Sequence, residues 1–131
     1  MDPVINLVAV LVGAIASMVI GMIWYGPLFG KTWMNLMGIN KSKMKDATKS
    51  YLIQFVGAIV MVYVLAHFVQ YAGAKDIIGG LQTGFWIWLG FIATVGLGSI
   101  LWDGKPLELY LINMGYHLVT LLIVGTILAV M

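Results

Sequence analysis

The polar side chains whose spacing could support chemistry lie near the end of this 131-residue chain. Intervals of three, four and three residues separate Tyr110, Asn113, His117 and Thr120. Such intervals place all four side chains on one face of a helix. Because an imidazole titrates near neutral pH, this polar stripe could form a ligand pocket or a polar path. Hydrogen bonding between helices, at about 0.6–2 kcal/mol per bond, explains the same pattern, and we favour that interpretation.

The elements that must position this stripe are four long apolar segments. Residues 4–25, 51–72, 79–102 and 109–131 contain no Asp, Glu, Lys or Arg. Their length matches the hydrocarbon thickness of a bilayer, about 30 Å. Only helices or a closed barrel satisfy the backbone in lipid, and these segments are too long for barrel strands and lack their alternation. We predict an all-α, integral membrane four-helix bundle, with the last helix over residues 107–131.

The composition leaves no room for a second, water-soluble domain. The mean hydropathy is +1.02 and only 9% of the residues are charged. Nearly all charges fall in the short gaps between the apolar segments, so residues 1–131 form one domain. The net charge of +2 does not indicate a nucleic-acid partner, because five of the seven lysines lie in one loop beside the membrane.

The lysines also predict how the chain crosses the membrane. The first and third gaps carry six lysines, whereas the second gap carries only Lys75. Cytoplasmic loops are enriched in Lys and Arg. We therefore expect loops 26–50 and 103–106 to be cytoplasmic and both termini to lie outside the cell membrane.

The two histidines, His67 and His117, raise the question of a bound metal or haem. Helix geometry places His67 about 24 Å and His117 about 13 Å along their helices from the cytoplasmic side. One iron within a monomer cannot meet both, although two copies of one histidine could meet across a dimer axis. The chain has no cysteine, which excludes thiolate catalysis and cysteine-ligated metals. We expect no metal and no cofactor. His67 shares a helical face with Tyr63 and Gln70.

The gaps themselves carry further signals. Apolar residues between positions 28 and 37 share one side of a short helix that Gly38 could end. This segment reads as an interfacial helix on the inner leaflet or, alternatively, as a loop packed under the bundle. Residues 40–50 are polar and basic and would extend the second helix. The gap at 73–78 permits only a tight turn, which makes the second and third helices antiparallel neighbours.

Small residues predict where the helices pack closely. Gly13, Ser17 and Gly21 recur every four residues in the first helix, and Gly80 and Gly84 do so in the third. Such ridges let two backbones approach in lipid, where dispersion replaces the missing hydrophobic drive. We expect the first and third helices to be interior elements.

Aromatic residues gather where these two helices end. Trp24 and Tyr25 precede Gly26 and Pro27, and Trp102 precedes a similar turn. Tryptophan and tyrosine favour the membrane interface, which explains their positions. Both ends read as Gly, a spacer, Trp, Gly, Pro and Leu, which admits an internal repeat of two helix hairpins. Membrane helices in general also tend to end in such residues.

One motif resembles a known family. Residues 24–34 read WYGPLFGKTWM, and residues 84–86, Trp102, 104–107 and 110–117 extend the similarity. The chain resembles an uncharacterised bacterial and archaeal membrane family, domain of unknown function 1761, over essentially its whole length. The resemblance implies a small four-helix membrane protein with no assigned activity and no catalytic residues to transfer.

These observations favour a non-enzymatic membrane protein. Asp103, Lys105, Glu108 and Tyr110 gather near one interface, but without the spacing of a catalytic triad or a metal site. We predict a subunit of a membrane complex, or an oligomer that binds lipid or a partner. The alternative is a small-solute transporter or channel, formed by an oligomer around the polar stripe of the fourth helix.

Overall fold

The structure, a computed structural model, describes residues 3–38 and 48–131. All of its elements are helical, and four helical segments (7–28, 48–71, 77–101 and 107–130) are long and apolar enough to cross a membrane. The predicted all-α fold with four such helices is confirmed. The elements are α1 (Leu7–Ile23), η1 (Trp24–Leu28), α2 (Gly30–Met37), α3 (Thr48–Tyr71), α4 (Ile77–Trp88), η3 (Leu89–Ala93), α5 (Thr94–Gly96), α6 (Gly98–Leu101) and α7 (Leu107–Val130).

Local sequence signals account for several helix ends. The side chain of Asn6 accepts hydrogen bonds from the backbone N–H groups of Val8 and Ala9, at 3.1 and 3.2 Å, and so caps α1. Asp76 caps α4 by accepting a bond from Gly79 N at 2.7 Å. Gly38 follows α2 with a φ of +69°, a left-handed conformation that glycine adopts without strain.

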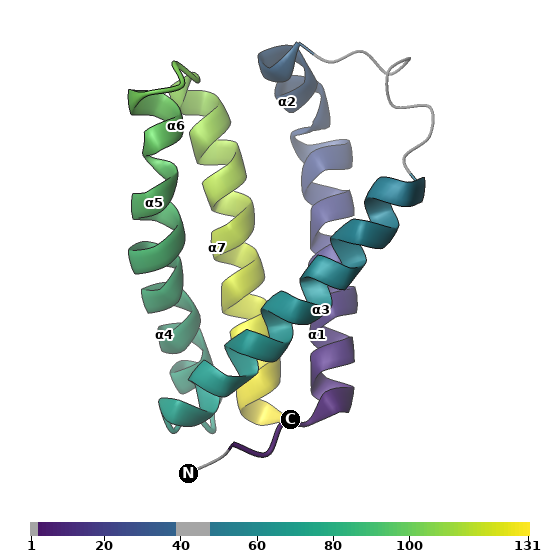
Figure 1. Ribbon diagram of the computed structural model, residues 1–131, viewed down its shortest axis with the longest axis vertical. Coiled ribbons are helices and arrows are strands. Elements are labelled where there is room, and N and C mark those ends of the chain that lie inside the picture. The colour runs from purple at the N-terminus through teal and green to yellow at the C-terminus, as the bar shows by residue number, and fades with distance from the viewer. Residues whose placement is uncertain (1–2, 39–47) are drawn as a thin grey trace.

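The two chain ends lie at the same end of the molecule (Figure 1). Asn6 Nδ2 donates to the carbonyl oxygen of Met131 at 3.4 Å, which ties the start of α1 to the end of α7. We call this the terminal end; the turn between α3 and α4 also lies there. The opposite end, the α2 end, holds α2 and the turn before α7.

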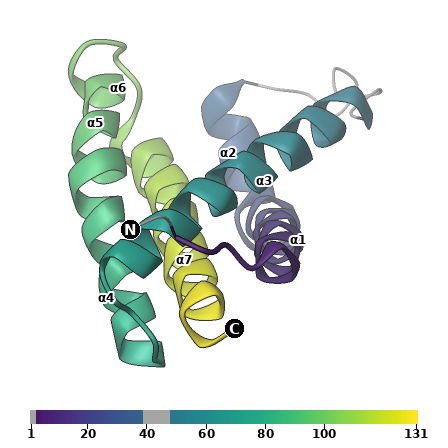
Figure 2. The ribbon, with the colours of Figure 1, turned by 60° about the horizontal axis from the view of Figure 1, so that its bottom comes forward.

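Three helix pairs account for most of the packing between the long helices. α4 packs along α7, and α1 packs against both α3 and α7. α3 is steeply inclined and passes across α7 and α1, so the helices do not all run side by side (Figures 1 and 2). The core contains nine buried residues from α1, α3 and α7, centred on Ala14, Val62 and Val124, which are fully buried.

Glycines bring α4 and α7 into backbone contact. A Cβ atom added to Gly80 would lie 2.6 Å from the carbonyl oxygen of Gly125, and one added to Gly125 would lie 2.7 Å from the carbonyl oxygen of Gly80. Gly84 is equally close to the backbone of Leu121. The small residues of the third spanning segment therefore face α7, but this segment is the least buried of the four, so the expectation that it is an interior element is wrong.

The structure differs from the sequence prediction in the third helix and in its neighbours. The segment 77–101 is not one regular helix, because a π-helical turn at Leu89–Ala93 and a bend at Leu97 interrupt it. α3 and α4 are neighbours only near their connecting turn and then diverge. The short helix after the first segment exists as α2, whereas most of the basic segment 40–50 lies outside the described residues.

Candidate functional site

Asn113, a member of the polar stripe on α7, hydrogen-bonds to the first spanning segment. Its Oδ1 accepts a hydrogen bond of 2.7 Å from the hydroxyl of Tyr25. Tyr25 lies in η1, a π-helical turn that also contains Pro27. Proline has no N–H, which removes one α-helical bond and accommodates the wider turn, closed by a 2.9 Å bond from Phe29 N to Trp24 O. The widened turn presents Tyr25 to α7.

Tyr110, one turn earlier on α7, bonds to a different neighbour. Its hydroxyl donates to the carbonyl oxygen of Ala93 at 2.6 Å. Ala93 is the last residue of η3, the second π-helical turn. The stripe therefore joins α7 to the first and third spanning segments through two separate bonds.

Two tryptophans hold the α7 backbone next to Asn113. Trp24 Nε1 donates to the carbonyl oxygen of Ile112, and Trp88 Nε1 donates to that of Met114, both at 2.9 Å. A Cβ atom at Gly115 would lie 3.0 Å from Cζ2 of Trp24, so glycine lets the indole approach closely. The sequence interpretation assigned Trp24 to the membrane interface; the structure places it half-buried against α7.

Tyr116 belongs to the same cluster, although the sequence analysis did not select it. Its hydroxyl donates to Ser17 O at 3.2 Å, and its ring centroid lies 5.3 Å from that of Tyr25. A Cβ atom at Gly21 would lie 3.3 Å from this hydroxyl. Tyr116 follows Asn113 by three residues, which is a helical spacing and the signal that could have selected it.

The small-residue ridge of α1 lies against two helices. A Cβ atom at Gly13 would be 2.8 Å from Val62 of α3 and 3.1 Å from Val124 of α7. Ser17 is only 2% exposed, and its hydroxyl donates to Ala14 O at 2.8 Å. Bulk at either position would separate helices that now touch.

The remaining members of the stripe, His117 and Thr120, make no side-chain hydrogen bond to a described residue. His117 is half-buried beside the ring of Tyr116, at a centroid distance of 5.1 Å. Thr120 is 2% exposed, and its Oγ1 has no hydrogen-bond partner among the described residues. The stripe therefore has one half that is hydrogen-bonded to neighbouring helices and one half whose side chains make no such bond in the described part of the chain.

His67 is not brought to the stripe. Its Nδ1 lies 2.9 Å from the carbonyl oxygen of Tyr63, and its ring contacts are with Tyr63 and Tyr71, all on α3. Gln70 reaches the segment that precedes α1, where its amide donates to Val4 O. No group of three His, Cys, Asp or Glu side chains suited to a metal occurs in residues 3–38 and 48–131.

The remaining residues of the aromatic motif are Gly26, Pro27 and Trp102. Gly26 and Pro27 are exposed, and Trp102 is 87% exposed at the α2 end. Trp102 thus differs from Trp24, its counterpart in the suggested repeat, which is bonded to α7.

The structure is therefore that of a small helical protein with four segments able to span a membrane. Hydrogen bonds from tyrosine and tryptophan side chains join the first of these segments to the last. The chain belongs to the family described as protein of unknown function (DUF1761), whose model matches residues 8–129. Neither the curated proteins nor the solved structures contain a match.

Proposed function

We propose that this protein is a non-enzymatic membrane component that acts by assembly within the bilayer, as a homo-oligomer or as a subunit of a larger membrane complex. The observation that supports the proposal is that most of the polar side chains between the helices are already hydrogen-bonded to one another or to the backbone. The hydroxyls of Tyr25, Tyr110 and Tyr116 and the indoles of Trp24 and Trp88 bond to neighbouring helices. Such groups stiffen a scaffold and are not free to carry a substrate.

A candidate surface for assembly lies on α3. Residues at intervals of three and four follow the side of this helix that faces away from the core: Ile53, Val56, Val60, Tyr63 and His67. This is the heptad spacing by which one helix packs on another. Tyr63 is 43% exposed, and its hydroxyl makes no hydrogen bond with a described residue. A polar group facing lipid is costly, so a second helix that bonds to Tyr63 would stabilise the assembly.

The proposal includes an orientation in the cell membrane. We place the α2 end, with loops 26–50 and 103–106, in the cytoplasm and both termini outside. The lysine distribution supports this orientation. The bond between Asn6 and Met131 supports a common side for the two termini.

Disulfide cross-linking tests the assembly surface, because the natural chain has no cysteine. Val60→Cys puts a thiol on the outer side of α3, and Phe91→Cys puts one on a residue of η3 that is 72% exposed. Mild oxidation in native membranes should yield a cross-linked species from Val60→Cys and not from Phe91→Cys. Equal yields, or a monomer without any partner after gentle extraction, would contradict the proposal.

Transport by an oligomer is a second candidate function. His117 and Thr120 support it, because neither hydrogen-bonds to a described residue although both lie on the buried or half-buried side of α7. Liposomes loaded with a pH-sensitive dye, with a potassium gradient and valinomycin, would report proton flux through the reconstituted protein. Flux that His117→Ala abolishes would favour transport; unchanged flux in His117→Ala and Asn113→Leu would remove this candidate.

A further inference from the structure

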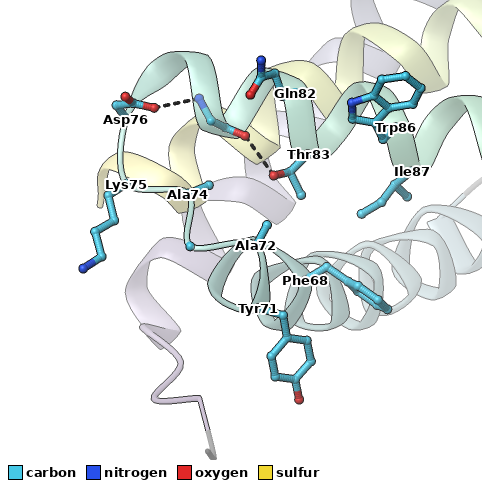
Figure 3. A pocket seen from close by; sticks show the side chains of 12 residues that line it. Phe68, Tyr71, Ala72, Ala74, Lys75, Asp76, Gln82, Thr83, Trp86 and Ile87 are labelled. Carbon is cyan, nitrogen blue, oxygen red and sulfur yellow. Dashed lines mark hydrogen bonds between the residues drawn. The ribbon is translucent and has the colours of Figure 1, made fainter.

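An opening lies at the terminal end, where α3 and α4 diverge from their turn. It is a cavity of about 680 Å³ between the two helices (Figure 3). This volume falls within the range of roughly 300–1,000 Å³ that small-molecule sites occupy. Its lining comes from the end of α3, the turn, and the first three turns of α4.

The lining of the cavity changes from charged to apolar with depth. Lys75 and Asp76 stand at the closed end, in the turn. Thr83 and Ile87 lie about 9 and 15 Å along α4 from its first residue, Ile77, at 1.5 Å per residue. The hydroxyl of Thr83 is occupied by a 2.8 Å bond to Gly79 O, which leaves its methyl group for the cavity wall. Phe68 of α3 lies opposite Ile87.

The closed end offers both signs of charge and room for a headgroup. Asp76 uses Oδ1 to accept the 2.7 Å bond from Gly79 N, and its second oxygen bonds to no described residue. Lys75 is exposed and makes no ion pair within the described part of the chain. The small residues Ala72, Gly73 and Ala74 directly precede these charges in the lining, which also includes Tyr71 and Gln82. A zwitterionic ligand whose phosphate and ammonium are joined by a short two-carbon linker complements this arrangement.

We propose that this cavity binds one phospholipid with a phosphoethanolamine headgroup. Its phosphate pairs with Lys75 and its ammonium donates to Asp76, while an acyl chain lies between Phe68 and Ile87. The order of headgroup, small residues and apolar walls follows the order of a lipid from the membrane surface inward. A second protein copy is a poorer occupant, because the lining carries one lysine and one aspartate beside the turn rather than a uniformly apolar face.

The headgroup is tested by native mass spectrometry of the full chain. The protein is released from micelles that contain equal amounts of dioleoyl phosphatidylethanolamine, phosphatidylcholine and phosphatidylglycerol. We expect one phosphatidylethanolamine retained per chain in preference to the other two. Asp76→Asn keeps an efficient helix cap and should abolish the preference over phosphatidylcholine, and Lys75→Gln should lower retention of all three lipids about fivefold.

Matched controls separate this site from general charge effects. Asp103→Asn and Lys105→Gln make the same changes in the turn at the α2 end and should leave retention unchanged. Equal retention of the three lipids by the natural chain, as loosely surrounding lipid would give, would overturn the proposal. Loss of retention in the control variants would also overturn it.

The chain-binding part is tested by filling the cavity. Ala72→Phe adds a ring to the small-residue region, whereas Val95→Phe adds one to a residue of α5 that is exposed elsewhere. We expect about fivefold lower phosphatidylethanolamine retention in Ala72→Phe and none of this loss in Val95→Phe. Circular dichroism of both variants verifies that they remain helical. Retention in folded Ala72→Phe equal to that of the natural chain would contradict the proposal.

Discussion

The hydroxyl of Tyr25 and the amide oxygen of Asn113 lie 2.7 Å apart, although 88 residues separate them in the chain. One belongs to an aromatic motif assigned to the membrane interface, and the other belongs to a stripe considered for transport. Their bond makes the two features one contact between the first and last spanning segments. In lipid, such a bond resists separation of helices that hydrophobicity alone would not hold together.

Removing this bond should destabilise the protein modestly. Tyr25→Phe and Asn113→Leu should each lower the free energy of unfolding by about 0.6–2 kcal/mol. The double variant should cost less than the sum of the two, because both remove the same interaction. Unfolding in mixed micelles with increasing dodecyl sulfate measures these differences. Tyr51→Phe, which changes an exposed tyrosine of α3, is the control; a fully additive double variant would argue against the contact.

Size should decide the outcome at Ser17. Ser17→Gly keeps the close approach of α1 to its neighbours and should be tolerated, because the hydroxyl bonds only within its own helix. Ser17→Leu and Ser17→Phe should prevent correct packing at a position that is 2% exposed. Yield of folded protein after detergent extraction and size-exclusion chromatography reports the difference. Normal assembly of the Leu or Phe variant would refute the predicted ridge.

A single methyl group should push α4 away from α7. Gly80→Ala places a Cβ atom 2.6 Å from the oxygen of Gly125, and the backbone at that point cannot yield cheaply. We expect a loss of about 1–3 kcal/mol in unfolding free energy. Gly90→Ala is the matched control, since nothing lies within 4 Å of the added atom. Similar stabilities of the two variants would contradict the close contact.

Reporter fusions check the proposed orientation. Alkaline phosphatase fused after Met131 should be active, and green fluorescent protein fused there should be dark, because the lysine distribution predicts that this end lies outside. A fusion inserted after Gly104, in the turn at the α2 end, should give the opposite result. A fluorescent fusion at Met131 would reverse the assigned orientation.

Much of the fold follows from the sequence alone, for a simple physical reason. Uncharged segments of about 20 residues are what a bilayer requires, so the number of spanning helices was predictable, whereas their ends differ from the expected positions by up to three residues. Gly38 was likewise expected to end the short helix, whereas the caps Asn6 and Asp76 were identified only from the structure. Gly80 and Gly84 indicated close packing before the structure identified α7 as their partner.

The arrangement of the helices was less predictable, because lipid-facing and interior positions are both apolar. Hydrophobic periodicity therefore says little about which helices touch, and the inclination of α3 was not foreseen. The roles of Trp24 and Trp88 were also missed, because each donates to a backbone carbonyl and leaves no complementary side chain to find. The π-helical turn at Leu89–Ala93 could not be predicted either, because unlike η1 it contains no proline.

Trp24 and Trp88 both donate to backbone oxygens of α7, and this choice of acceptor bears on how the family can vary. Every amino acid supplies a main-chain oxygen, so the bonds from the indoles of Trp24 and Trp88 do not depend on which side chains stand at positions 112 and 114. Relatives should accordingly retain the two aromatic donors, and packing alone should limit the residues at the two acceptor positions.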